Sequence, residues 1–432
     1  MKFRSFLFWL HLIAGLISGL AIGLMCFTGT VLAFEKELVA WWERDARRVE
    51  APAAGAARLP LAELEARFRA AEPEARVSSL VLQNDPTAAP AFSAGRGGGY
   101  YVNPYTGEVR RPASTAMSGF MHTMTDLHRY LGFHGEQSRP IGKLINGVCN
   151  LAFFVLAVTG LYLWVPRVWS WRTIRPVLWF RRTSSAKARD FNWHNAIGLW
   201  SAPVLIVLTL TAVPISFRWG GDLIYKLTGT PAPAASPTAG GAPGEAGPGR
   251  GGPGRGGEGR GGPARGGPGR GGPGGPVVAV APPGPGATLL DADAIVGAVA
   301  RAHPDWRTLT LRLGFAANQA ATVTVRERSS WPRTATTSVS VNPYTGEIAQ
   351  RSGYAEMNAA QQVRSWTRFL HTGEALGWAG QFVAGLACLG GVFLVYTGFA
   401  LSWRRFFGRP AAADPAPEAA SQPRETRSSA GR

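Results

Sequence analysis

The sequence predicts an α-helical membrane protein, in which an internal duplication builds a four-helix transmembrane bundle and two small α+β domains outside the membrane. Three observations support this fold class: four long stretches carry no charged residue, the segments between them show helix and strand periodicity, and the two halves of the chain repeat one another. The 432 residues suggest about three domains by length alone. A soluble enzyme is excluded, because each charge-free stretch exceeds the roughly 20 residues that cross a bilayer.

The charge-free stretches define the expected transmembrane helices. The first could be a cleaved signal peptide, but it is about twice as long as a typical signal core and no convincing A-x-A site follows it. We therefore expect it to anchor the chain. The four stretches cover residues 5–34, 144–166, 191–217 and 375–403.

Charge predicts the topology. The formal net charge is +18, which in a soluble protein would suggest a nucleic-acid partner. Here the loop 167–190 alone carries seven basic residues against one acid. A short basic loop of this kind stays on the cytoplasmic side of the membrane. We therefore expect this loop and both termini in the cytoplasm, the long connections on the outer face, and no nucleic-acid partner.

The two long connections contain matching soluble segments, 55–112 and 288–351. In each, a stretch of helical periodicity is followed by short alternating strands. The hexapeptide NPYTGE recurs at 103–108 and 342–347, where proline and glycine provide turn chemistry. Each segment therefore predicts one small helix-plus-antiparallel-sheet domain.

The membrane segments repeat as well. His11 and His194 each begin an H-x-x-x-G-L sequence, and Thr28 and Thr211 each lie 17 residues beyond their histidine. Leu-His precedes the second and fourth spans, and Thr-Gly lies near the inner end of both. Since both halves start on the cytoplasmic side, the repeats are parallel and not inverted.

Two segments are expected to be disordered. Residues 231–286 are almost entirely Gly, Pro, Ala and Arg, a composition that cannot bury a core, and the cytoplasmic tail 410–432 is similar. We interpret the first as a solvated spacer.

Four histidines are the candidate site residues. His11 and His194 should lie at similar depth near the cytoplasmic end, and His128 and His371 at similar depth near the outer end. Ionisable residues in membrane helices mark functional sites. A lone imidazole with a hydrogen bond would be an ordinary interfacial residue. Two imidazoles that face each other across a porphyrin, on helices with small residues beside them, are how bundles hold b-type haem, and the matched pairs favour this interpretation. No C-x-x-C-H sequence for covalent haem occurs, and the three cysteines lie in the spans.

Small residues lie beside these histidines. Gly15 and Gly19 follow His11 at intervals of four, and Gly198 follows His194 in the same way. Such glycines let either a flat cofactor or another helix approach the backbone closely, and both interpretations stay open.

The remaining histidines are weaker candidates. His122 and His134 each lie six residues from His128, a rotation of about 240° on a helix, so neither shares its face. His122 is kept as the alternative outer ligand, and His134 could also replace His128 if the register differs. His303, before Pro304, is expected on the surface. No nucleotide-binding or flavin motif occurs, so reductant must come from another protein or the quinone pool.

The order of the four spans, the paired H-x-x-x-G-L and Leu-His sequences, the Thr-Gly near the inner ends and the NPYTGE of each half resemble the PepSY-associated transmembrane family. The resemblance covers almost the whole chain except the spacer and the tail. The resemblance implies a multi-pass protein of the bacterial inner membrane with two PepSY-like periplasmic domains. It also implies two b-type haems per chain, with His11 and His194 as axial ligands near the inner face and His128 and His371 near the outer face.

The better understood relatives in that family imply an activity. They reduce ferric siderophores, so electrons from the quinone pool or a cytoplasmic reductase would reach an Fe(III) chelate on the periplasmic side and release Fe(II) for uptake. The alternative is a non-enzymatic membrane-anchored PepSY module that binds or regulates a partner, or an accessory subunit of a permease. Both alternatives leave the four paired histidines unexplained.

Overall fold

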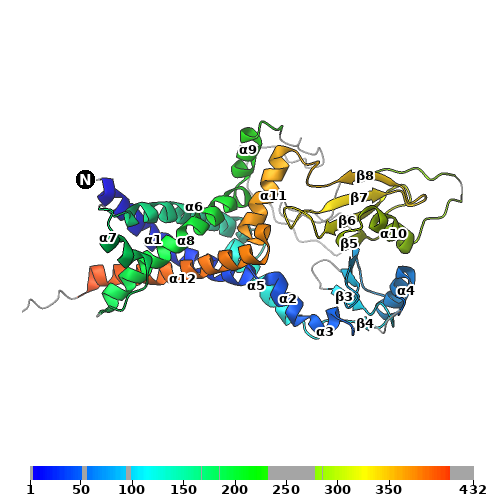
Figure 1. Ribbon diagram of the computed structural model, residues 1–432, viewed down its shortest axis with the longest axis horizontal. Helices are drawn as coiled ribbons and strands as arrows, with labels where there is room; N and C mark the ends of the chain where they lie inside the picture. The colour runs from blue at the N-terminus through cyan, green and yellow to red at the C-terminus, as the bar shows by residue number, and fades with distance from the viewer. Residues whose placement is uncertain are drawn as a thin grey trace, which may run out of the picture.

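A helical bundle forms one end of the molecule and a β-sheet the other, in the computed structural model (Figure 1). The structure describes residues 3–50, 56–93, 99–166, 168–183, 185–231, 278–284 and 286–408. Most of the expected spacer 231–286, and the whole tail 410–432, lie outside the described residues.

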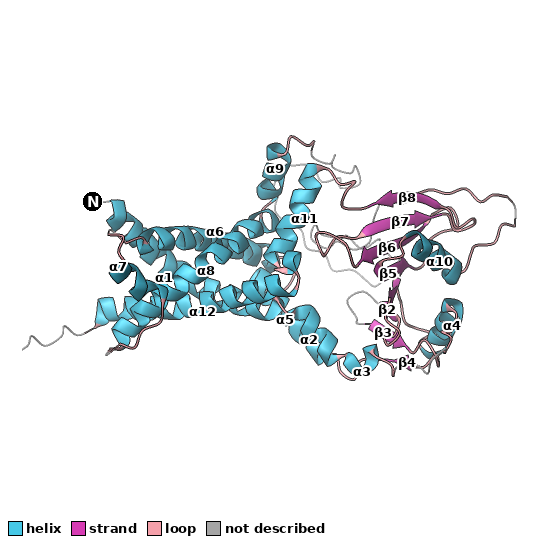
Figure 2. Ribbon diagram, viewed as in Figure 1, coloured by secondary structure: helices cyan, strands magenta, loops and turns pink. Residues whose placement is uncertain are grey.

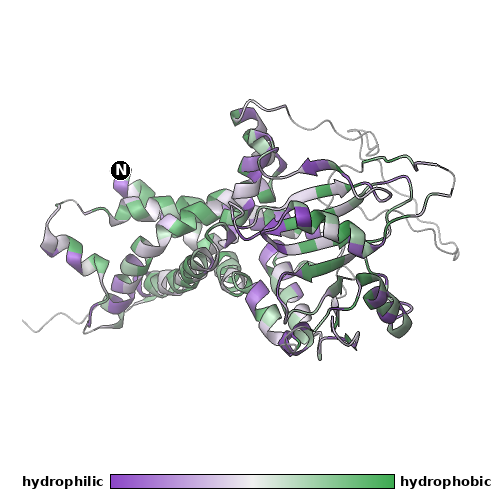
Figure 3. Ribbon diagram, turned by 45° about the vertical axis from the view of Figure 1, so that its right-hand side comes forward, coloured by the Kyte–Doolittle hydropathy of each residue, from purple (hydrophilic) through white to green (hydrophobic). Residues whose placement is uncertain are grey.

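Four helices are long and apolar enough to cross a membrane. They overlap the four charge-free stretches and are mostly hydrophobic along their length (Figure 3). The first and third each pack against the second and fourth, so the first and third face each other diagonally across the bundle. These helices are α1 (Phe3–Leu32), α6 (Ser138–Trp164), α8 (Ala186–Ser216) and α12 (Trp378–Phe407).

The strands form one antiparallel sheet in the order β4-β3-β2-β1-β5-β6-β7-β8. The two soluble segments each supply four neighbouring strands, and β1 joins the halves by pairing with β5 from Ser79 opposite Arg312 to Gln83 opposite Thr308. The two α+β units therefore share a sheet. The strands are β1 (Ser79–Gln83), β2 (Ala91–Ser93), β3 (Gly99–Val102), β4 (Val109–Arg110), β5 (Trp306–Arg312), β6 (Ala321–Glu327), β7 (Thr337–Val341) and β8 (Ile348–Ser352).

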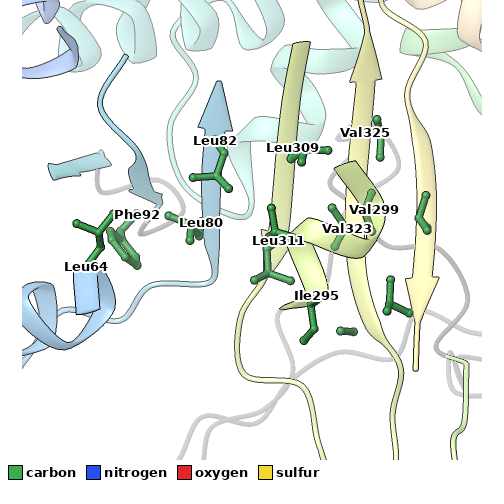
Figure 4. Close-up of a cluster of buried hydrophobic side chains, with 14 of the residues drawn as sticks. Leu64, Leu80, Leu82, Phe92, Ile295, Val299, Leu309, Leu311, Val323 and Val325 are labelled. Carbon is green, nitrogen blue, oxygen red and sulfur yellow. The ribbon is translucent and has the colours of Figure 1, made fainter. Parts of the chain in front are cut away.

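The core of the sheet runs across this join. Helices α4 (Leu61–Ala71) and α10 (Ala292–Ala302) cover the sheet, one from each half, and their buried side chains meet those of the strands (Figure 4). At the join, Leu80 lies opposite Leu311 in the strand register, and both are buried. Burial of each such leucine contributes about 1.5–3 kcal/mol, which explains why the halves are held together.

The repeated NPYTGE hexapeptide has a structural role. The side-chain oxygen of Asn103 accepts a hydrogen bond from the backbone N–H of Tyr105 at 2.9 Å, and Asn342 accepts the same bond from Tyr344 at 2.9 Å. The glycine of each copy adopts a positive φ, 72° at Gly107 and 76° at Gly346, which favours glycine. The repeat therefore builds two equivalent turns and supplies no site.

Short helices lie between the bundle and the sheet (Figure 2). Of these, α5 packs against α1 and α6, and α11 packs against α8. At the other end of the bundle, α7 (Trp171–Leu178) lies in the basic loop, on the same side as the start of α1 and the end of α12 (Figure 1). The short helices are α2 (Glu35–Trp42), α3 (Arg44–Arg47), α5 (Ala116–Tyr130), α9 (Arg218–Leu227), α11 (Ala359–His371) and the 3-10 turn Glu374–Leu376. We call the two ends of the bundle the sheet end and the terminal end.

Candidate functional site

Two histidines face each other near the terminal end of the bundle. His11 on α1 and His194 on α8 have ring centroids 6.4 Å apart, with an angle of 84° between the ring planes. The diagonal arrangement of α1 and α8 brings these distant residues together. We call them the terminal-end pair.

A threonine on a third helix fixes each of these rings. Nδ1 of His11 lies 3.0 Å from the hydroxyl of Thr159 on α6, and Nδ1 of His194 lies 2.9 Å from that of Thr397 on α12. Each threonine hydroxyl donates its own proton to a backbone carbonyl one turn earlier, at 2.7 and 2.8 Å. The threonine must then accept from the histidine, so Nδ1 carries the imidazole proton and Nε2 keeps its lone pair.

The glycine after each threonine leaves space for the ring. A Cβ atom on Gly160 would lie 3.3 Å from Cε1 of His11, and one on Gly398 would lie 3.7 Å from Cε1 of His194. The recurring Thr-Gly pair is thus a device in which threonine orients the imidazole and glycine accommodates it. The sequence showed the recurrence but not its role.

A second pair lies at the sheet end. His128 on α5 and His371 on α11 have ring centroids 6.2 Å apart, with 53° between the planes. Nδ1 of His128 donates to the carbonyl of Met25 at 3.1 Å and lies 2.9 Å from the hydroxyl of Thr28. Nδ1 of His371 donates to the carbonyl of Leu208 at 2.9 Å. A carbonyl can only accept, so Nε2 is again the nitrogen with the free lone pair.

The Nε2 atoms of all four histidines have no hydrogen-bond partner among the residues that the structure describes. Burial lowers the pKa of His128 to about 4, with a further contribution from the neighbouring His371. Burial also lowers the pKa of His371. Both rings of this sheet-end pair are therefore neutral at pH 7, the form in which imidazole binds metals.

The two pairs lie at opposite depths. His11 and Met25 are 14 residues apart on α1, as are His194 and Leu208 on α8. At a rise of 1.5 Å per residue, each interval spans about 21 Å along the bundle. In a hydrocarbon core of about 30 Å, this places one pair near each face.

The sheet-end pair lines a cavity of about 490 Å³, a volume typical of cofactor sites. Residues from α1, α2, α5, α6, α8, α11 and α12 contribute to its wall. Five of them are cationic and two are acidic. The cations are Lys36, Arg129, Lys143, Arg364 and Arg368, and the acids are Glu35 and Glu374.

The glycines singled out in the sequence lie against other helices. A Cβ on Gly15 would meet Leu156 at 3.8 Å, one on Gly19 would meet the ring of Phe399 at 2.9 Å, and one on Gly198 would meet Leu394 at 3.6 Å. These positions serve helix packing. The glycines beside the histidines are instead Gly160 and Gly398, together with Gly29, whose Cβ would lie 3.4 Å from Cε1 of His128.

The other candidate histidines lie away from the pairs. His122 and His134 are exposed and lie 3.5 and 3.9 Å from the carboxylate of Asp126. The expectation that His303 lies on the surface is wrong. It is buried, because its Nδ1 bonds Glu327 of β6 at 2.9 Å after α10 ends.

Within the described part of the chain, no group of three or more His, Cys, Asp or Glu side chains could hold a metal ion. A bare metal bound at either pair would have only two protein ligands. A flat macrocycle that supplies its own four donors is the group that two opposed imidazoles suit, as in bis-histidine haem proteins.

The fold and the paired histidines define a membrane protein that combines a four-helix bundle with a soluble antiparallel sheet. Residues 8–405 match the model of the family described as PepSY-associated TM region. The chain therefore belongs to this family, as its sequence resemblance indicated. A comparison with curated proteins gave no match.

Proposed function

We propose that this chain is a di-haem electron-transfer protein of the bacterial inner membrane that reduces Fe(III) chelates, such as ferric siderophores, at the sheet end. The observation that supports the proposal most strongly is the presence of two facing imidazole pairs at opposite depths of one bundle. A single site would suffice for a sensor, whereas transfer across the membrane needs a site near each face.

The geometry of both pairs fits a haem iron between the rings. Two metal–imidazole bonds of about 2 Å, plus roughly 1 Å from each nitrogen to its ring centre, give a centroid separation of about 6 Å. The observed separations are 6.4 Å for His11 and His194 and 6.2 Å for His128 and His371. The unpartnered Nε2 atoms are the donors that such an iron requires.

When bound, haem b would supply a one-electron carrier near each face. The protein's own groups determine how each imidazole is presented: Thr159, Thr397 and the carbonyls of α1 and α8 hold the protons on Nδ1 and so fix the ring orientation. If both histidines of a pair hold the haem, its iron would have no free position for a chelate. The iron in the chelate would therefore be reduced without the chelate binding to the haem iron.

Release of iron follows from coordination chemistry. The hard oxygen ligands of most chelators hold Fe(III) far more tightly than Fe(II). The sheet end would face the periplasm, and the basic loop 167–190 with both termini would face the cytoplasm. The equivalent 14-residue intervals on α1 and α8 support an internal duplication as the origin of the two halves.

The test uses full-length protein in detergent, chemically reduced and mixed anaerobically with a ferric siderophore. We expect the reduced haem bands to disappear as Fe(II) appears in a ferrous-trap assay. His371→Ala should slow this transfer while the haem at His11 and His194 stays reducible, and His122→Ala on the exposed face of α5 is the control. If haem-loaded protein transfers electrons to no chelate, the non-enzymatic binding or permease-accessory function is favoured.

A further inference from the structure

The charge of the sheet-end cavity indicates which ferric chelates it accepts. Lys36 forms an ion pair with Glu374 at 2.5 Å. The other four cations of the wall have no carboxylate partner among the described residues. They are Arg129, Lys143, Arg364 and Arg368.

Two of these four cations share one face of a helix with a histidine of the pair. Arg364, Arg368 and His371 lie at positions i, i+4 and i+7 of α11, with Thr367 between them, and all four line the cavity. At 1.5 Å per residue, Arg368 lies about 4.5 Å and Arg364 about 10 Å along the helix from His371. Because α11 runs from the sheet toward the bundle, Arg364 lies on the outer side.

The outer arginine is held in place by α9. Its guanidinium carbon lies 5.7 Å from the ring centroid of Tyr225, which is buried. A Cβ on Gly221 would lie 3.7 Å from an Arg364 guanidinium nitrogen. A cation stacked on an aromatic ring keeps its N–H groups free to bind an anion.

After both acids of the wall are counted against its five cations, three positive charges remain, which exceeds the two carboxylates of haem b. We infer that the mouth of this cavity, at Arg364, binds ferric chelates that carry free negative charge, such as carboxylate-type chelates, in preference to neutral ones. This inference rests on the proposed function and narrows its substrate class. The guanidinium would bind a chelate carboxylate through two N–H groups while the iron stays in its chelator.

The test compares Arg364→Gln with wild type, using reduced full-length protein in detergent. One substrate is ferric citrate, which is anionic, and the other is a ferric trihydroxamate without carboxylates. We expect Arg364→Gln to lower the second-order rate of haem reoxidation by ferric citrate about tenfold at low salt. The rate with the trihydroxamate should not change, and high salt should remove the wild-type preference for citrate. Arg364→Lys should retain part of the rate.

Arg351→Gln is the matched control, because Arg351 is an exposed arginine of β8 outside the cavity wall. An equal loss of the haem reoxidation rate with both chelates, or no loss of the rate with either, would overturn the inference. Altered haem content in Arg364→Gln would overturn it as well, because Arg364 would then belong to the cofactor site.

A second measurement separates this inference from the proposed function. Ga(III) citrate has the charge of ferric citrate but cannot be reduced, so calorimetric titration of the haem-loaded protein reports binding alone. Binding to wild type that is lost in Arg364→Gln supports the anion site, even if no chelate is reduced. Absence of Ga(III) citrate binding in wild type contradicts the anion site, even if reduction occurs.

Discussion

The hydroxyl of Thr28 lies 2.9 Å from Nδ1 of His128, although a hundred residues separate them in the chain. The equivalent residue of the second half, Thr211, bonds only backbone carbonyls of its own helix in the described structure. The two halves therefore orient their sheet-end histidines differently, one through a hydroxyl and a carbonyl and the other through a carbonyl.

This difference gives a matched pair of variants. Thr28→Val removes a hydrogen-bond partner of a proposed iron ligand and should weaken haem binding at the sheet end about tenfold, whereas Thr211→Val should leave it unchanged. Haem dissociation to apomyoglobin measures this. Equal effects of the two variants would show that the hydroxyl of Thr28 does not support the site.

Alanine at the two glycines beside the terminal-end pair should disturb the two histidine rings to different extents. A methyl group on Gly160 would lie 3.3 Å from the ring of His11, which is tighter than ordinary contact, whereas one on Gly398 would lie 3.7 Å from His194. Gly160→Ala should therefore shift the electron paramagnetic resonance signal of the haem proposed at this pair, and Gly398→Ala should not. The opposite order would contradict the observed packing.

The ion pairs at the terminal end predict a loss of stability. Asp190 is fully buried and binds Arg189 of its own helix and Arg404 of α12. Asp190→Asn leaves two partly exposed guanidinium groups without their carboxylate and should destabilise the fold by about 1.5 kcal/mol. Thermal unfolding in detergent measures the change, with the exposed Asp222→Asn as control. A melting temperature equal to that of wild type would show that the pair contributes nothing.

Orientation in the membrane can be tested by cysteine labelling in a variant that lacks the three native cysteines. Ala316→Cys, in the exposed loop between β5 and β6, should react with an impermeant maleimide in intact spheroplasts. Arg172→Cys on α7 should react only after lysis, because the proposed orientation puts the basic loop on the cytoplasmic side. Labelling of Arg172→Cys in intact spheroplasts would reverse the proposed orientation.

Hydrophobic length and periodicity allowed much of this structure to be anticipated, because they depend on local sequence. The four long helices overlap the charge-free stretches, and α4 and α10 appear where apolar residues recur at helical intervals. The facing of His11 with His194, and of His128 with His371, followed from matched positions in two repeated halves.

Contacts between segments that are distant in the chain could not be predicted from the sequence in the same way. Nothing in Ser79–Gln83 specifies that its free edge pairs with β5, because strand edges expose the same backbone groups whatever their partner. Intervals of four residues placed Gly15 and Gly19 on one face but could not show which neighbour that face meets. The same holds for the buried His303, whose hydrogen-bond partner Glu327 lies 24 residues later in the chain.

The central claim is that four histidines form two bis-histidine haem sites, and haem content per chain tests it most directly. Purified wild-type protein should contain two b-type haems by the pyridine haemochrome assay, and alanine at any one of the four histidines should leave one. The double variant His11→Ala/His194→Ala should lose no more haem than either single variant, whereas His11→Ala/His371→Ala should lose both haems. Colourless wild-type protein, or full haem content in all four single variants, would contradict the account.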